Sequence, residues 1–312
     1  MDKKDLKIVF LGTPDFAVES LDRLVSGGYN VVGVVTMPDK PAGRGHNMLQ
    51  SPVKKYAVEH DLKLMQPVKL KDEAFVEELK ALDADLFIVI AFRMLPEVVW
   101  QMPPMGTFNL HASLLPRYRG AAPINWAIIN GDTRTGVTTF FLKHEIDTGD
   151  VIDQVAVDIA PEDNVGTLHD RLMHLGAELT ISTVERIIAG NLKPIAQDDM
   201  AAGVEPTPAP KIFKDTCKID WIRTAAEVHN LVRGLSPYPA AWTDISVNGK
   251  ETTMKIFRTA VTDIPAAGKP GEMVVDGQRL FINCADSRLE ILNLQVQGKR
   301  PTDAAAFVCG LH

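Results

Sequence analysis

The sequence predicts an α/β protein with a doubly wound, Rossmann-like first domain and a small β-rich second domain. Apolar runs typical of buried strands alternate with helical patterns as far as Gly190. Residues 193–211 then carry four prolines and little periodicity. Short β-prone runs broken by Gly, Pro and Asp follow from Trp242 onward. We therefore expect a first domain over residues 1–190, a semi-rigid linker over 191–210 and a second domain over 211–312.

The opening of the chain has the order of elements that a doubly wound sheet requires. Residues 7–11 read as a buried strand because 8–11 form a continuous apolar run, and a Gly-Thr-Pro turn follows. A helical pattern then leads to Gly27 and Gly28, and residues 31–36 read as the second strand. The turn lacks the Gly-x-Gly-x-x-Gly fingerprint, so a dinucleotide site gets little support.

The same alternation continues through the rest of the first domain. Further strands are predicted at 62–66, 85–91 and 106–111, and helices at about 72–82 and at 124–129. The runs 137–142 and 151–157 flank a turn and resemble an antiparallel hairpin. A strong amphipathic pattern from Val165 predicts a long helix that ends at Gly190.

The second domain is predicted to hold one helix and a small β-barrel. The helical pattern covers about 224–234, and five or so short β-runs follow Trp242. Short strands at this spacing are typical of small barrels. In contrast, residues 37–52 hold several prolines and glycines, and we expect an irregular loop there with no strand or helix.

The composition is that of an ordinary globular protein, with 46% hydrophobic and 23% charged residues. No run of 18 apolar residues occurs and the N-terminus has no apolar core, so we expect neither a membrane span nor a signal peptide. Cys217, Cys284 and Cys309 are odd in number and widely spaced. They predict no disulfide framework and no metal site, and they suit a reducing cytoplasm. We expect a cytoplasmic monomer without a metal.

The net charge of −7 argues against a strongly basic nucleic-acid binder. The charge is uneven, however. Residues 211–312 hold 13 basic and 11 acidic side chains, whereas the remainder holds 20 basic and 29 acidic ones. A mildly basic second domain permits a local RNA-binding surface without requiring one.

Asn109 and His111 are the first candidates for chemistry. They lie two apart on a predicted strand, so both side chains project from the same face. An amide donor beside an imidazole suits stabilisation of a developing oxyanion, and Asp147 in a tight Asp-Thr-Gly-Asp turn could supply a base. Taken singly, His111 could equally be a satisfied core histidine and Asn109 a turn former.

The longer string is specific. Asn-Leu-His-Ala-Ser-Leu-Leu-Pro-Arg-Tyr-Arg-Gly from Asn109, followed by Asp-Thr-Gly-Asp from Asp147, resembles the active-site signature of the 10-formyltetrahydrofolate-dependent formyltransferases. Within that superfamily, Pro-Asp-Lys-Pro-Ala-Gly-Arg-Gly at 38–45 and Ser-Pro-Val-Lys at 51–54 resemble the branch that formylates initiator methionyl-tRNA. The resemblance covers nearly the whole chain and is strongest over residues 8–150.

The resemblance implies roles for named residues. Asn109, His111 and Asp147 would be catalytic, and 10-formyltetrahydrofolate would be the co-substrate, with no metal. Lys40 and Arg44 would contact the tRNA. The second domain would be an OB-like β-barrel that assists tRNA binding. The residues implied for folate are Phe92, Ser113, Leu114, Leu115, Pro116 and Asp150.

Two departures from the family pattern bear on those roles. Many relatives carry two lysines after the Arg-Gly of the tRNA-binding loop, where this chain has His46 and Asn47. The turn that lines the pterin pocket in the family is shortened here and contains Arg93. The first departure removes up to two positive charges from the predicted RNA contact, and the second alters the shape predicted for the pocket.

Three other functions remain open at this point. A sister formyltransferase acting on a sugar nucleotide or a purine intermediate would share the catalytic set, but should lack the 38–45 insertion and a β-rich second domain of this kind. A folate-binding or RNA-binding protein without catalysis would need neither His111 nor Asp147. A nucleotide-dependent enzyme of the doubly wound class is disfavoured by the missing phosphate-binding glycines.

Overall fold

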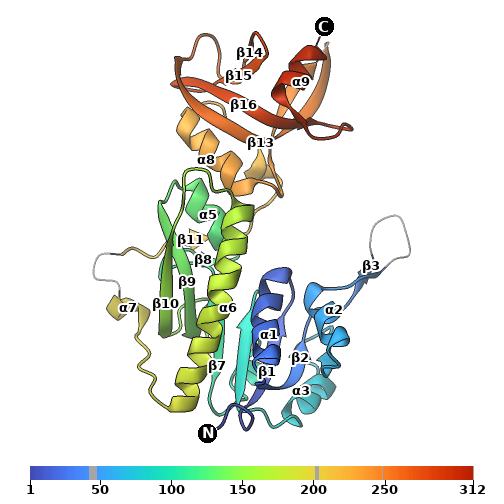
Figure 1. The fold of residues 1–312 in the computed structure, drawn as a ribbon, viewed down its shortest axis with the longest axis vertical. Helices are drawn as coiled ribbons and strands as arrows, with labels where there is room; N and C mark the ends of the chain where they lie inside the picture. The colour runs from blue at the N-terminus through green and yellow to red at the C-terminus, as the bar shows by residue number, and fades with distance from the viewer. Residues whose placement is uncertain (42–47, 201–203, 248, 312) are drawn as a thin grey trace. The chain divides into compact units, whose positions relative to one another are not determined.

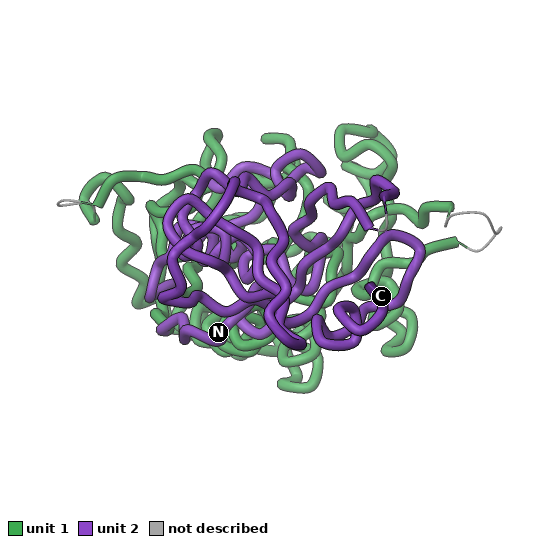
Figure 2. Tube along the Cα trace, turned by 90° about the horizontal axis from the view of Figure 1, so that it is seen from above, with its two compact units in different colours: residues 1–120, 136–157, 169–208 green, residues 121–135, 158–168, 209–312 purple. Residues whose placement is uncertain are grey.

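The computed structural model describes residues 1–41, 48–200, 204–247 and 249–311, and the chain forms two compact units. Unit 1 contains residues 1–120, 136–157 and 169–208, and unit 2 contains residues 121–135, 158–168 and 209–312 (Figure 2). The chain therefore passes between the two units more than once. The linear division at residues 190 and 211 stays a prediction.

Unit 1 is built on a seven-stranded sheet in the order β10-β9-β7-β6-β1-β2-β5. The strands β5, β2, β1, β6 and β7 run parallel to one another, and β9 is antiparallel to β7. The predicted doubly wound sheet is confirmed. In sequence order the strands are β1 (Lys7–Gly12), β2 (Asn30–Val35), β5 (Leu64–Met65), β6 (Leu86–Ile90), β7 (Thr107–His111), β9 (Arg134–Phe141) and β10 (Val151–Asp158).

Helices pack on both faces of this sheet, as its apolar strands require (Figure 1). The helices α3 (Glu73–Lys80) and α4 (Glu97–Trp100) share a core with Val9 and Val89. On the opposite face, α6 (Val165–Ala189) places Gly176 against Leu110 of β7. The helix α1 (Asp15–Ser26) meets α6 through an edge contact between Phe16 and His169.

The segment after β2 contains more structure than the sequence predicts. Instead of an irregular loop over 37–52, β3 (Lys40–Pro41) pairs with β4 (Met48–Leu49), so that prediction is wrong at these residues. The helix α2 (Pro52–Glu59) follows at once, because Ser51 Oγ accepts the Lys54 N–H and Pro52 is preset for a first turn. Residues 42–47, including Arg44, His46 and Asn47, lie outside the described residues.

Unit 2 combines two packed helices with an antiparallel sheet. The helix α5 (Pro123–Ile129) meets α8 (Ala225–Leu235) where Gly234 lies against Ile129. A capping box between Thr224 and Glu227 starts α8. The sheet order is β12-β13-β16-β15-β14, with β17 beside β16, and every one of these pairs is antiparallel.

The β-rich second domain is thus confirmed. Its strands are β12 (Ala241–Val247), β13 (Lys250–Pro265), β14 (Met273–Asp276), β15 (Arg279–Asn283), β16 (Ser287–Val296) and β17 (Thr302–Asp303), and the helix α9 (Ala304–Cys309) follows. Their core includes Trp221, Met254 and Leu294. Of the helices in the described ranges, none combines the length and the apolar character that a bilayer crossing needs.

His229 of α8 gives unit 2 a pH-dependent stability. Its Nδ1 lies 2.8 Å from Thr259 Oγ1, and burial, helped by Arg233, holds the pKa of His229 below its ordinary 6.5. As the pH falls, this ring is therefore protonated in the unfolded chain at a higher pH than in the folded chain. Its stabilising effect is present above about pH 6.5 and is lost as the pH falls.

We predict that His229→Gln unfolds in urea with a weaker dependence on pH than the wild-type chain between pH 7.5 and 5. The measurement is the difference between the two unfolding free energies at each pH, followed by tryptophan fluorescence. A constant difference across the series would contradict this role of His229.

Candidate active site

The strand β7 brings Asn109 and His111 to one end of the unit 1 sheet. It lies between β6 and β9, with Asn109 in register with Val89 on one side and Phe140 on the other. Because the two residues alternate with buried Leu110, they share one face of the strand. The predicted side-by-side arrangement is confirmed by this register.

His111 is only 7% exposed, and its two ring nitrogens have different surroundings. Nε2 lies 2.8 Å from the carbonyl oxygen of Tyr118. A carbonyl can only accept, so Nε2 carries the hydrogen and Nδ1 is the unprotonated nitrogen of the neutral ring. Nδ1 lies 3.9 Å from Asp147 Oδ2. This distance is too long for a hydrogen bond but places a carboxylate beside the ring if Nδ1 gains a proton.

Asp147 is held in a conformation that few non-glycine residues adopt. Its φ is +55°, in the left-handed region. The Gly120 N–H donates to Asp147 Oδ2 at 2.9 Å, which fixes the carboxylate. Gln197 Nε2 donates to the carbonyl oxygens of Asp147 and Gly149 at 2.8 and 2.9 Å, which fixes the backbone of the turn.

Asn109 completes the arrangement with a polar atom that has no partner. Its side-chain oxygen Oδ1 is buried, and no described group hydrogen-bonds to it. Buried polar atoms are nearly always satisfied, and exceptions are common at sites that bind a ligand. Asn109 is therefore the member of the set most ready to meet a substrate.

Hydrogen bonds from β9 and β10 stabilise the loop after β7. Thr138 Oγ1 donates to the Ser113 carbonyl at 2.6 Å, and Gln154 Nε2 donates to the Leu115 carbonyl at 2.8 Å. Leu115 is 2% exposed and packs with Phe140 and Val151. Leu114 lies against Gly136. Both leucines anchor the loop in unit 1, and their contact with folate stays a prediction.

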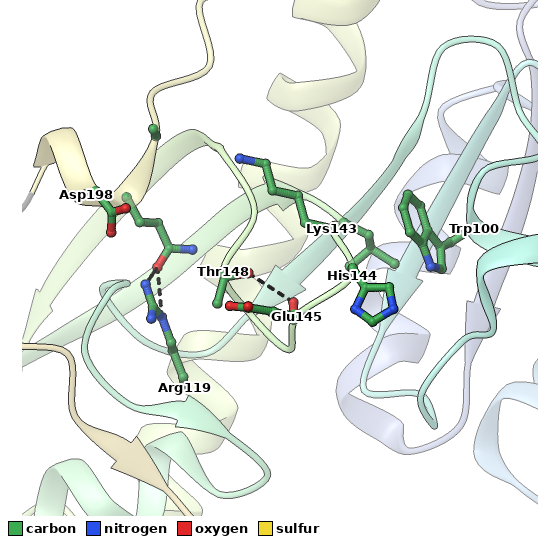
Figure 3. A pocket seen from close by; sticks show the side chains of 10 residues that line it. Trp100, Arg119, Lys143, His144, Glu145, Thr148 and Asp198 are labelled. Atoms are coloured by element: carbon green, nitrogen blue, oxygen red, sulfur yellow. Dashed lines mark hydrogen bonds between the residues drawn. The ribbon is translucent and has the colours of Figure 1, made fainter.

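A cavity of about 570 Å³ opens beside the Asp147 turn (Figure 3). This volume falls in the range of small-molecule sites, about 300–1,000 Å³. Its lining includes Trp100, Arg119, Leu142, Lys143, His144 and Thr148. None of the six residues predicted to bind folate lines this cavity within the described part of the chain.

The predicted folate residues outside the loop have structural partners. Asp150 accepts a hydrogen bond from Lys143 Nζ at 2.7 Å. Phe92 packs against the α3–α4 core, and the Arg93 guanidinium donates to the carbonyls of Pro67 and Val68.

Of the lysines near the predicted tRNA contact, Lys40 is exposed on β3, whereas Lys54 is paired with Asp39 at 2.5 Å. That pairing holds the pKa of Asp39 below its ordinary value, so Lys54 adds little free positive charge there.

Two residues that hold the site have no recognisable signal in the sequence. Gln197, in α7 (Gln197–Met200), and Thr207 fall in the predicted linker, and Arg119 lies inside the motif but has no predicted role. Arg119 Nε and Nη2 donate to Gln197 Oε1 at 3.1 and 2.8 Å (Figure 3). Across the described residues, no cluster of three or more His, Cys, Asp or Glu side chains could hold a metal ion.

Comparison with known proteins places both parts of the chain. The model of the formyl transferase family matches residues 6–184, and that of the formyl transferase C-terminal domain matches residues 211–312. A methionyl-tRNA formyltransferase of Bacteroides thetaiotaomicron is 60% identical over 302 residues, 96% of this chain and 94% of the relative. One of Bacteroides fragilis is 57% identical over 314 residues, 100% of this chain and 97% of the relative.

A solved structure shares the fold at low identity. The N-formyltransferase of Helicobacter canadensis, in complex with folinic acid and dTDP-3-aminofucose, has a TM-score of 0.68 and 21% identity. The match covers 92% of this chain and 98% of that protein. Because it extends over most of the chain, a second domain does not by itself exclude a sister enzyme. The close relatives, not the domain count, separate the alternatives.

Proposed function

The chain belongs to the formyl transferase family, and within it to the methionyl-tRNA formyltransferases; from that premise we propose that it transfers a formyl group from 10-formyltetrahydrofolate to the α-amino group of initiator methionyl-tRNA. The observation that carries the proposal is the site itself. His111 Nδ1 lies 3.9 Å from the Asp147 carboxylate, and the strand that holds His111 also holds Asn109, whose buried Oδ1 has no partner among the described groups.

The chemistry requires a neutral amine and a stabilised oxyanion. The α-amino nitrogen attacks the formyl carbon, and the new C–N bond creates a tetrahedral carbon bearing a negative oxygen. The Asn109 side-chain N–H group is suited to donate to that oxygen, and such a donor typically lowers a barrier by about 3–4 kcal/mol. Collapse breaks the bond between the carbon and N10 and releases tetrahydrofolate.

The tautomer of His111 assigns the proton transfer to one atom. With Nε2 donating to the Tyr118 carbonyl, Nδ1 is free to accept the proton that the attacking nitrogen must lose. The imidazolium then carries its charge beside the Asp147 carboxylate, which compensates it. The same Nδ1–H can be returned to the departing N10. No covalent enzyme intermediate is needed.

Unit 2 offers a surface suited to an RNA backbone. The ammonium groups of Lys214 and Lys218 lie 5.6 and 5.1 Å from the ring centroid of Trp242. Lys214 and Lys255 also line a cavity of about 350 Å³ together with Gln295. Lys218 is paired with Asp244 at 2.9 Å, so the positive charge offered to RNA comes mainly from Lys214 and Lys255. Positive charge beside an aromatic ring and amides fits phosphate and ribose contacts. We assign tRNA binding to this surface and to Lys40 and Arg44.

We also propose that the protein works as a cytoplasmic monomer. Cys217 and Cys284 are buried free thiols and Cys309 is an exposed one, which suits a reducing compartment. Translation supplies the aminoacylated tRNA in that compartment.

The experiment that tests the function is incubation with 10-formyltetrahydrofolate and charged initiator tRNA, followed by product analysis. Formylmethionine esterified to the tRNA is the expected product, and tRNA with a blocked α-amino group is the control. Formylation of an amino-sugar nucleotide or a purine intermediate, with methionyl-tRNA unchanged, would contradict the proposal and favour a sister enzyme.

We predict that His111→Ala and Asp147→Asn each lower the single-turnover rate by about 10²–10⁴-fold, as loss of a general acid–base group does. Asn109→Ala should behave similarly through lost oxyanion stabilisation. Affinities for folate and tRNA should stay close to those of the wild type. Thr183→Val, which removes only a buried 2.8 Å hydrogen bond to Thr139, is the matched control. Near-wild-type turnover of His111→Ala would refute the proton-transfer scheme.

If the segment 38–45 contacts tRNA, its basic residues should affect how tRNA affinity depends on salt concentration. Each phosphate contact with a single strand contributes a slope of roughly −0.7 in log affinity against log salt concentration. Arg44→Ala and Lys40→Ala should therefore weaken tRNA binding and make the slope shallower, while folate binding holds. Lysines at both 46 and 47 should steepen it. The check is tRNA affinity across a salt series; an unchanged slope in Arg44→Ala would remove this loop from the RNA contact.

The unit 2 surface predicts a separate effect on tRNA. The double change Lys214→Ala and Lys255→Ala should raise the KM for tRNA about tenfold with kcat unchanged, because phosphate contacts position the RNA and take no part in the chemistry. Lys269→Ala, in the same unit but outside the cavity lining, is the control. Equal effects of the double variant and the control would assign tRNA binding elsewhere.

A further inference from the structure

Two residues outside the recognised motifs hold both members of the catalytic pair. We infer that Gln197 and Thr207 are positioning residues for Asp147 and His111. The inference rests on the proposed function, because it names what sets the geometry of that same site. Gln197 borders the cavity beside the Asp147 turn but is only 2% exposed, so we expect both residues to act through their hydrogen bonds and not through contact with a substrate.

Gln197 fixes the Asp147 side of the pair. It is 2% exposed, and its side-chain amide makes four hydrogen bonds. Its Nε2 donates to the Asp147 and Gly149 carbonyls, and its Oε1 accepts two N–H groups of Arg119. A buried amide with four such bonds has only one orientation that satisfies them.

Thr207 fixes the His111 side. Its Oγ1 accepts the Tyr118 N–H at 2.9 Å, and its carbonyl accepts the Arg119 N–H at 3.0 Å. Tyr118 has a φ of +60°, and its own carbonyl holds His111 Nε2. The hydroxyl of Thr207 therefore acts on His111 through a single residue.

The two sides are joined through residues 118–120. Tyr118 holds His111, Arg119 reaches Gln197, and the Gly120 N–H binds the Asp147 carboxylate. Asp147 and Tyr118 both have a left-handed backbone, a strained conformation for non-glycine residues that persists only where neighbouring contacts hold it. Loss of the hydrogen bonds from Gln197 or Thr207 should let the backbone relax and should move Asp147 or His111. A displacement of about 1 Å at such a site can lower a rate about 100-fold.

The kinetic test uses Gln197→Met, Gln197→Glu and Thr207→Val. Met keeps the volume of Gln197 and loses all four bonds, whereas Glu keeps the acceptor for Arg119 and loses the two donors to the turn. Each should lower kcat at least about tenfold, with the KM for folate and for tRNA within about twofold of wild type. Thr183→Val should leave kcat unchanged. Wild-type kcat in Gln197→Met would overturn the inference.

A second arm separates positioning from mere stability. If Gln197 acts through Asp147, Gln197→Met should cause little further loss in an Asp147→Asn background, because the two changes remove one function. Likewise, Thr207→Val should add little to His111→Ala. Multiplicative losses in both backgrounds would show that the residues only support the fold, and would overturn the inference.

A third arm does not depend on activity. Amide hydrogen exchange over residues 117–122 should accelerate in Gln197→Met and Thr207→Val but not in Thr183→Val, because the Gly120 N–H loses its fixed acceptor. If the wild-type chain failed to formylate methionyl-tRNA, the proposed function would fall while this arm still decided the positioning role. Unchanged exchange in both variants would overturn the inference.

Discussion

The position of the Asp147 carboxylate depends on a turn in which Asp147 has a left-handed backbone. A non-glycine residue adopts that conformation only where other contacts stabilise it. Its φ of +55° is maintained by hydrogen bonds from Gly120 and Gln197, one to the side chain and one to the main chain. In the proposed mechanism this carboxylate compensates the charge that His111 gains. Its distance of 3.9 Å from His111 Nδ1 decides whether a proton gained by the ring finds a compensating charge.

The sheet supplies the other half of the geometry. The strand β7 is held between β6 and β9, so Asn109 and His111 cannot rotate away from their shared face. The loop that follows is hydrogen-bonded to Thr138 and Gln154, and its Leu115 is buried. The backbone that carries Asn109 and His111 is therefore held in place, while the buried Asn109 Oδ1 has no partner among the described groups.

Local signals explain what the sequence could predict. Apolar runs and helical periodicity identify the sheet of unit 1 and α6, because those patterns follow directly from burial. The motif predicts Asn109, His111 and Asp147 as the catalytic residues. The short pairing of Lys40 with Leu49 has no such pattern, and Lys54 looks like free charge although Asp39 neutralises it. Gln197 acts on Asp147 from 50 positions away and through a backbone carbonyl, which leaves no trace in residue type.

The central claim is that hydrogen bonds from outside the motif set the separation of His111 and Asp147, the proposed catalytic pair. A crystal structure of Gln197→Met measures it most directly, through the His111 Nδ1 to Asp147 Oδ2 distance and the φ of Asp147. The account predicts that the distance increases beyond 3.9 Å and that the backbone of Asp147 leaves the left-handed region. The same distance and the same φ in the variant would contradict it.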